Sequence, residues 1–446
     1  MNRALSLFLA FVMLLTGCAP YVKPATYDGL RGLIQREEYN EASSYIDKNK
    51  ESLYGTDTIQ YWFDKGLVTH HAGRYKESIR YFDTAEKVVN RTIKEKGNID
   101  WPDNYELAYI NVFQALNYLF IGQNDEALVE ARKIDHRFKT LSSGTGGSYR
   151  EDPFVRYLMG LIYEETGELN DAYISYGLGL DEYKNVKYPI PAGIRDELEK
   201  RYALTGDSLG FNEKKSQKKT TQPDGGELIV IDYNGFAPYK VDEYEPVLLT
   251  AVVDGRVYNK PGTIALPRLV SYQSRIEYAV IHMENASAGF RSKPLTTFTA
   301  QNTGNIAAMN LNEKIPEIRK NALLAANIDF QVQKSLEIEE QKKQKDNKNY
   351  NPFDLNNLWS MLPTIVAATI VRSAVTQGVN YHFADKRGWQ TLPARIEIAT
   401  STLPEGVYSA SISFCDPSGN VVKTKTIKKI NIVSGHKTFL LVRTGL

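Results

Sequence analysis

The sequence contains few of the residues from which catalytic and metal centres are built. Only two cysteines and six histidines occur among its 446 residues, and they form no zinc-ligand spacing such as His-Glu-x-x-His. The Gly-x-Ser-x-Gly motif of serine hydrolases is also missing. We therefore expect a protein without a metal, without a conventional cofactor and without enzymatic activity, and no catalytic residue is assigned.

An excess of charge of one sign is missing as well. Lysine and arginine total 54 against 53 aspartate and glutamate residues, which gives a net charge of +1. A neutral balance offers no electrostatic basis for binding nucleic acid. A membrane-spanning helix needs about 20 consecutive apolar residues, and we expect no such helix in the mature chain. Nucleic acid is therefore not an expected partner.

The N-terminus carries the features of an export signal. Arg3 precedes an apolar run from Ala4 to Leu15, which is too short to span a bilayer. The run ends in Leu15-Thr16-Gly17-Cys18, which resembles the lipobox of bacterial lipoproteins. The resemblance implies that residues 1–17 are removed as a signal peptide. It also implies that Cys18 is linked to diacylglycerol, whose acyl chains hold the protein at a membrane.

The same resemblance indicates where the protein is held. Residue 19 is alanine, whereas an aspartate there retains lipoproteins at the inner membrane in many enteric bacteria. We therefore expect an anchor in the outer membrane, facing the periplasm, with the inner membrane as the alternative. Residues 18–28 would form a tether. Acylation of Cys18 leaves Cys415 without a partner cysteine, so no intramolecular disulfide is expected.

Residues 29–205 are expected to form helices in pairs. Apolar side chains recur at helical spacing on both sides of Gly73, Gly122 and Gly167. A glycine turn, a small residue at the helix crossing and an alanine in the second helix resemble the tetratricopeptide repeat (TPR). The turn glycines lie 49 and 45 residues apart instead of 34, which predicts long loops between repeats. Generic antiparallel helical hairpins are the alternative.

The resemblance to TPRs also implies a binding groove. In that family, the first helix of each pair lines the concave side. Carried over to this chain, the candidate partner-binding residues are Phe63, Leu67, His70, Tyr109, Val112, Leu116, Tyr157, Leu161 and Glu164. Packing between repeats is the alternative role for the apolar members of this set.

The period of the apolar pattern changes after a polar, turn-rich linker at residues 206–226. Residues 227–446 contain short segments that alternate between apolar and polar residues, and Asp254-Gly255 predicts a tight hairpin. We therefore expect an α+β protein of several domains: an all-α TPR-like domain, then an antiparallel, sandwich-like β-rich domain.

A helical and low-complexity insertion is expected at residues 315–383. It begins with a helix at 315–340, and the charged stretch 337–351 is expected to be mobile. A mostly apolar helix is expected at 358–379. About 14 consecutive apolar residues are typical of a buried helix, although docking to the membrane or to a partner is an alternative.

The segment that follows contains Asp385, Arg387 and Trp389. Together with Asp152-Pro153-Phe154 and the residues from 235 to 240, it resembles an uncharacterised family of bacterial TPR lipoproteins. The resemblance implies an architecture and an envelope location but no reaction. From the residues themselves, we interpret Asp385 and Arg387 as a structural clamp and Trp389 as a packing anchor.

These observations favour a membrane-anchored periplasmic scaffold that binds an envelope protein through its repeat groove. Peptidoglycan synthesis, export and surface-polymer assembly are the processes it would serve. One alternative is a structural or oligomeric component that uses the helix at 358–379. A cell-wall-active enzyme with its site in the β-rich domain is the other.

Overall fold

The computed structural model describes residues 24–55, 57–96, 101–143, 149–184, 189–211, 225–346 and 381–444. Cys18, the signal peptide and the helix expected at 358–379 lie outside the described residues. The chain forms two compact units. The larger unit comprises Val22–Tyr239, Ser271–Asn310 and Arg387–Leu446, and the smaller unit includes Lys240–Val270 and Leu311–Lys386.

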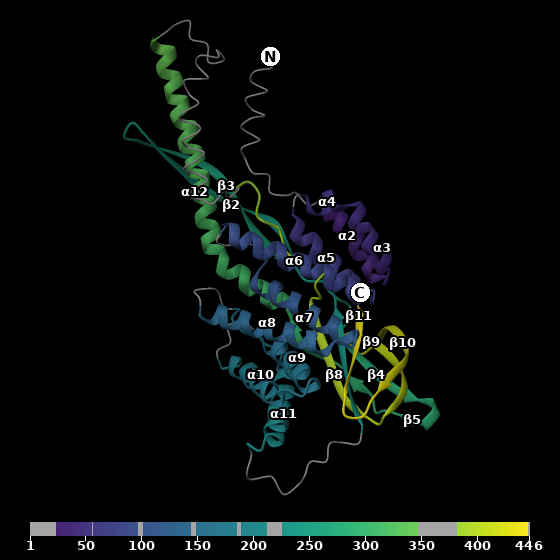
Figure 1. Ribbon diagram of the computed structural model, residues 1–446. Coiled ribbons are helices and arrows are strands. Elements are labelled where there is room, and N and C mark those ends of the chain that lie inside the picture. Colours follow the sequence, from purple (N-terminus) through teal and green to yellow (C-terminus); the bar gives the residue numbers. More distant parts are fainter. Residues whose placement is uncertain are drawn as a thin grey trace. The chain divides into compact units, whose positions relative to one another are not determined.

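The larger unit begins with a series of helical hairpins (Figure 1). Short turns join α2 to α3, α5 to α6, α7 to α8 and α9 to α10. The short α4 and the final α11 complete the series. The helices are α2 (Pro24–Gln35), α3 (Tyr39–Lys48), α4 (Lys50–Tyr54), α5 (Thr58–His71), α6 (Tyr75–Lys96), α7 (Asn104–Phe120), α8 (Asn124–Ser143), α9 (Pro153–Glu165), α10 (Leu169–Glu182) and α11 (Ala192–Ser208).

All four hairpins use the same turn. One residue adopts a left-handed conformation, and the next amide donates to the carbonyl five residues back, as in a Schellman motif. In the first hairpin, Glu37 has φ 60° and Glu38 N donates to Leu33 O at 2.9 Å. Glycine, which has no Cβ to strain this conformation, takes the same place in the others, at Gly73, Gly122 and Gly167.

Small residues let the two helices of a hairpin approach closely. A Cβ on Gly66 would lie 2.5 Å from the ring of Phe82, and a Cβ on Gly160 would lie 2.1 Å from the ring of Tyr176. These contacts confirm TPR-like helical hairpins. The prediction of long loops between repeats is partly wrong. Much of the length beyond a 34-residue repeat lies in the second helices, since α6 has 22 residues and α8 has 20.

Two sheets with a common core follow the helices. One has the strand order β11-β1-β8-β7, and the other has the order β10-β9-β4-β5 with β6 beside β4. Leu228, Val230 and Val442 of the first sheet share a buried cluster with Ile281 and Ile412 of the second. The strands are β1 (Gly226–Asn234), β4 (Tyr278–Asn285), β5 (Phe290–Arg291), β6 (Leu295–Thr296), β7 (Phe298–Asn302), β8 (Arg395–Leu403), β9 (Gly406–Cys415), β10 (Val421–Ile432) and β11 (Lys437–Thr444).

This arrangement confirms the α+β class and the sandwich-like packing. The expectation of purely antiparallel strands is wrong, because β1 and β11 pair in parallel. A parallel pair requires a long connection instead of a tight turn, and here most of the C-terminal half of the chain lies between the two strands.

The smaller unit consists of a long hairpin and a long helix. Strands β2 (Tyr239–Val253) and β3 (Arg256–Val270) flank the turn, where Asp254 and Gly255 have φ values of 51° and 73°, as the sequence predicts. The helix α12 (Thr303–Asp346) packs Ala322, Ala325 and Phe330 against Leu249 and Ile264 of this hairpin.

Several boundaries differ from expectation. The helix α12 begins at Thr303 instead of at residue 315. Residues 337–346 continue α12 as a helix instead of forming a mobile stretch. At the other end of the chain, α2 begins at Pro24, inside the expected tether, because Tyr27 is buried and bonded to Asp64 of α5. Among the described helices, none is both long and apolar enough to cross a membrane.

Candidate functional site

The predicted groove lies in the interior of the larger unit. Eight of the nine candidate residues are at most 3% exposed, namely Phe63, Leu67, His70, Tyr109, Val112, Leu116, Tyr157 and Leu161. The ninth, Glu164, has a side chain only 10% exposed, which accepts hydrogen bonds from Arg201 and Tyr176 and forms an ion pair with Lys437 of β11 at 2.6 Å. These side chains therefore pack inside the protein, which was the alternative role for the apolar members. Buried side chains cannot line an open groove, so the prediction of an open partner-binding groove at these residues is wrong for this structure.

The protein's own residues Arg387–Pro393, here termed the groove segment, fill part of the concave side. Trp389 is 2% exposed, and its ring centroid lies 4.6 Å from that of Phe63 and 5.7 Å from that of Phe113. Phe82 of α6 completes the cage at 5.8 Å. Trp389 is thus the packing anchor that the sequence predicts, and one of the rings that it contacts, Phe63, is a predicted groove residue.

Hydrogen bonds fix the backbone of the groove segment. The backbone N–H of Trp389 donates to Glu106 Oε1 at 2.7 Å, and Gln60 Nε2 donates to the carbonyl of Gly388 at 2.9 Å. The carbonyl of Leu392 accepts from the N–H of Ala237 at 2.7 Å. Side chains of the repeats and the backbone of Ala237 therefore hold this segment, which turns at residues 390–391.

Asp64 of α5 connects the groove segment to the first helices. Its carboxylate accepts hydrogen bonds from the hydroxyls of Thr391 at 2.6 Å, Tyr27 at 2.8 Å and Tyr54 at 3.0 Å. Burial raises the pKa of Asp64 to about 6, although the three hydroxyl donors and Arg31 favour the charged form. Asp64 is not among the site residues predicted from the sequence. The only signal in the sequence was that this carboxylate directly follows Phe63, a predicted groove residue.

Asp152 plays the same part in the fourth hairpin. It caps α9 by accepting from Val155 N at 3.0 Å, and its other oxygen accepts from Tyr149 Oη at 3.0 Å and from Gln301 Nε2 of β7 at 2.6 Å. Burial raises the pKa of Asp152 to about 6. The Asp152-Pro153-Phe154 motif therefore starts a helix and binds a strand at once.

The structure assigns Asp385 and Arg387, two residues of the second family-like motif, to different units. Asp385 is exposed and belongs to the smaller unit, where its neighbour Lys386 forms an ion pair with Asp242 at 2.6 Å. Arg387 belongs to the larger unit, where it lies 4.0 Å from Asp57 and over the ring of Trp101. The motif thus spans the point where the chain passes from one unit to the other.

The paired histidines face the first sheet. His70 Nδ1 lies 2.7 Å from Asn117 Oδ1, and burial lowers the pKa of His70 to about 4, so the ring is neutral at pH 7. His71 Nε2 lies 3.0 Å from a guanidinium nitrogen of Arg443 on β11. The ring of Tyr233 lies within 6 Å of both imidazoles. The two histidines therefore lie on the groove side of α5, where strands of the protein's own sheet cover them.

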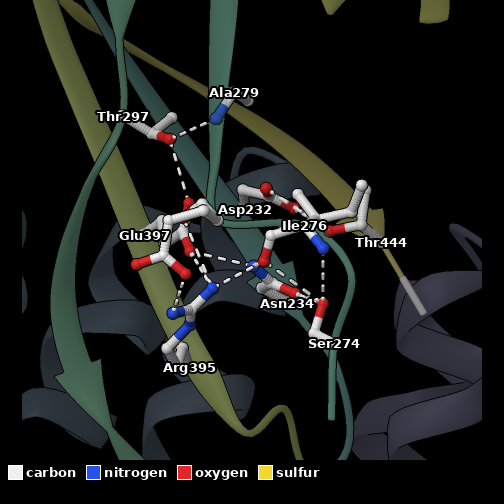
Figure 2. Close-up of polar contacts among 10 residues, drawn as sticks. Asp232, Asn234, Ser274, Ile276, Ala279, Thr297, Arg395, Glu397 and Thr444 are labelled. Carbon is white, nitrogen blue, oxygen red and sulfur yellow. Dashed lines mark hydrogen bonds and ion pairs between the residues drawn. The ribbon is translucent and has the colours of Figure 1, made fainter. Parts of the chain in front are cut away.

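Figure 2 shows a second polar cluster, which lies at the end of the sandwich core. Asp232 of β1 and Glu397 of β8 stand directly opposite each other in the sheet, and both are fully buried. Glu397 accepts from Asn234 Nδ2 at 2.9 Å and from Thr297 Oγ1 at 3.0 Å, and it lies 3.3 Å from Arg395.

The second carboxylate of this cluster has weaker partners. The hydroxyl of Thr444 donates to Asp232 at 3.2 Å. Burial, reinforced by the charge of Glu397, raises the pKa of Asp232 well above its usual range, and burial also raises the pKa of Glu397. Paired carboxylates can act as an acid and a base, but these two have no exposed surface. In this conformation they are internal structural groups, out of reach of a substrate.

The other side chains that could bind a metal or act as a nucleophile are dispersed. Among the described residues, no three His, Cys, Asp or Glu side chains are close enough to hold a metal ion. The thiol of Cys415 is buried at the end of β9, with its sulfur 3.7 Å from Ser413 O.

Fold and site together define an α+β protein in which TPR-like hairpins pack against a segment and a sheet of the same chain. No protein-family model matches the sequence, and no curated protein matches it. Among the solved structures that are similar to part of it are two of the same protein. Both are of "nearly identical TPR-like repeats" of a putative kinesin light chain from Podosopora anserina, one of them a variant with a single substitution. Each shows 14% identity and a TM-score of 0.31 over 43% of this chain and 88% or 87% of the other.

Proposed function

We propose that this protein is a lipid-anchored scaffold in an assembly of the bacterial cell envelope, where it binds another envelope protein. The lipobox-like sequence before Cys18 supports the anchor. The TPR-like hairpins support the scaffold, because stacked helical repeats offer extended surfaces for protein partners. Peptidoglycan synthesis, export and surface-polymer assembly are the processes covered by the proposal, and it assigns no catalytic residue.

The binding surface must lie outside the concave groove, which the protein's own chain fills. An apolar surface remains on the last helices of the series. Ile174 and Leu178 of α10 are 47% and 38% exposed, and Phe211, just after α11, is 57% exposed. The ring of Tyr173 stacks on Tyr202 with centroids 4.2 Å apart and lies 5.1 Å from the ring of Phe211. These five residues are termed the terminal patch.

The terminal patch is the observation that carries the proposal. Each helical layer of the series packs on the layer before it, and α11 packs on both α9 and α10. The end of such a stack normally carries a polar face, because no further repeat covers it. Here the end carries exposed apolar side chains. We infer that a helix of the partner protein packs on the terminal patch as the next helix of the stack.

In-cell photocrosslinking tests this surface. A photoreactive amino acid is placed at Ile174, Leu178 or Phe211, and Val129 of α8, which is also apolar and 51% exposed, serves as the matched control. A discrete envelope protein captured at the patch but not at Val129 supports the scaffold. Its capture should fall at least tenfold when both Ile174 and Leu178 are replaced by glutamate. Adducts only with a second copy of this chain would favour the oligomeric alternative instead.

The anchor has its own test. Metabolic labelling with an alkyne fatty acid should mark the wild-type protein and not the Cys18→Ser variant, and only the wild type should sediment with outer membranes. Equal labelling of both proteins would contradict acylation at Cys18. A label on wild-type protein found in the inner membrane would correct the location alone.

A further inference from the structure

The larger unit contains a hollow that none of the features above uses. Its volume is about 220 Å³, and it lies between α2, the loop after β1 and the loop before β4. A water molecule occupies about 30 Å³ in the liquid, so the hollow holds about seven waters or one small organic molecule. We term it the α2 pocket. Its lining residues are Asp28, Arg31, Gln35, Gly235, Phe236, Tyr272, Gln273 and Ser274.

Arg31 gives the pocket a buried cation, which is partly neutralised by Asp28 and, without a direct hydrogen bond, by Asp64. The residue is 6% exposed, and its guanidinium donates to Asp28 at 2.5 Å and to the neutral Gln390 at 2.7 Å. The Asp28 side chain is 67% exposed, so water screens its charge. The Nε of Arg31 is buried and has no hydrogen-bond partner. A buried cation whose only directly paired carboxylate is exposed to water can accept an anion as a further partner.

Aromatic rings hold this cation in place. The guanidinium carbon lies 4.2 Å from the ring centroid of Tyr272, 5.4 Å from that of Tyr239 and 5.7 Å from that of Tyr27. Stacking on aromatic faces restricts the guanidinium without using its N–H groups. An anion entering the pocket therefore meets a guanidinium that is already oriented, and the N–H groups that do not donate to Asp28 or Gln390 are left for a carboxylate.

The other residues that line the pocket suit an N–H group next to the carboxylate of the ligand. Asp28 presents a carboxylate at the mouth of the pocket, and Gln35, Gln273 and Ser274 add carboxamide and hydroxyl groups. Ser274 Oγ is fixed by donating to Asn234 Oδ1 at 2.7 Å. A molecule with both a carboxylate and an N–H group would find Arg31 as the partner for its carboxylate and Asp28 as an acceptor for its N–H group.

We infer that the α2 pocket binds a small carboxylate with an adjacent N–H group, that is, a free amino acid or the carboxy-terminal residue of a peptide. The carboxylate would lie on Arg31 and the N–H group toward Asp28. The site is separate from the terminal patch and does not depend on the proposed scaffold function.

Calorimetric titration of the full chain with three probes tests the chemistry. Alanine carries both a free amine and a free carboxylate, N-acetyl-alanyl-alanine carries only the carboxylate, and alanyl-alanine amide carries only the amine. Saturable binding of alanine or the acetylated peptide, with at least tenfold weaker binding of the amide, supports the pocket. Alanine alone would identify a free amino acid, and the acetylated peptide a peptide terminus. No saturable binding of any probe at 10 mM (about −2.7 kcal/mol as a limit), or equal binding of the amide, would overturn it.

Substitutions locate the binding site. Arg31→Gln should weaken binding at least tenfold. Because Arg31 is buried, Gln273→Glu at the exposed rim provides a second variant, which should also weaken binding by placing a negative charge beside the carboxylate. Arg36→Gln, one residue beyond the end of α2, is the matched control, since Arg36 forms an exposed ion pair with Glu38. If Gln273→Glu and Arg36→Gln bind the probe equally well, the assignment to this pocket is wrong.

Discussion

At the scale of single residues, buried polar side chains join parts of the chain that are far apart in sequence. Asp64 accepts from Thr391, which is 327 residues further on, and Asp152 accepts from Gln301, 149 residues further on. A buried polar group left without its partner costs about 1–3 kcal/mol. These contacts therefore favour one particular pairing of repeats and sheets over other compact arrangements.

Trp389 should contribute most to stability among the residues of the groove segment. Replacement by alanine removes a fully buried indole from a cage of three phenylalanines, and such a change costs about 3–5 kcal/mol. Urea unfolding should show a lower midpoint with an unchanged slope. Phe383→Ala, at a side chain 48% exposed, should shift the midpoint little. A similar shift for both variants would contradict the groove segment's role.

Asp64 should make the protein more stable at mildly acidic pH. Its folded pKa of about 6 lies above the value of about 3.9 in an unfolded chain, so the native state binds the proton more tightly. The free energy of unfolding should therefore rise as the pH falls from 7 toward 4.5. The full contribution is about 3 kcal/mol, and Asp152 acts in the same direction.

Asp64→Asn isolates this effect, because asparagine has nearly the same shape and does not titrate. Urea unfolding at several pH values should show that the wild type gains stability relative to the variant as the pH falls. Asp125→Asn, at an exposed position in the first turn of α8, controls for the loss of one negative charge. A difference between wild type and Asp64→Asn that is constant with pH, or that shrinks at low pH, would refute the assignment.

At the scale of helices and strands, the close helix crossings should be sensitive to one methyl group. Gly66→Ala would place a Cβ 2.5 Å from the ring of Phe82, and overpacking of this kind costs about 1–3 kcal/mol. The cost should be smaller in a Phe82→Leu background, which a double-mutant cycle measures. Gly32→Ala in α2 meets only the flexible end of Arg36 and should be neutral or stabilising. Equal effects at both glycines would contradict the crossing geometry.

Local signals explain which elements the sequence could predict. The turn glycines marked three of the four hairpins, since a left-handed residue is needed at each turn, and Asp254-Gly255 marked the long β-hairpin. Such signals involve neighbouring residues only. The parallel pairing of β1 with β11 has none, because the two strands lie about 200 residues apart and either would also suit an antiparallel sheet. The end of α12 was missed because its Lys- and Glu-rich sequence also suits a solvated coil.

At the scale of the whole molecule, the same pattern of residues can serve two purposes. Apolar side chains along the first helices of the hairpins can line a groove for another protein or pack against the protein's own sheet. Sequence spacing identifies the positions, and their burial confirms that they face inward. Sequence spacing could not identify the segment that fills the groove. The hydrogen bond from the Trp389 N–H to Glu106 joins residues that are 283 positions apart. The groove positions were thus predictable, and their use was not.

This dependence of the repeats on the sheets leads to a test with fragments. A fragment of residues 24–211 would expose the concave side that Trp389, Tyr233 and β11 cover in the full chain. It should therefore bind a hydrophobic dye and melt without a cooperative transition, and a fragment of residues 225–446 should restore that transition when added. Trp389→Ala in the second fragment should weaken the association at least a hundredfold, since about 3 kcal/mol corresponds to that factor. Cooperative melting of the first fragment alone, at the temperature of the full chain, would show that the repeats are stable without the sheets and that the groove can be vacated for a partner.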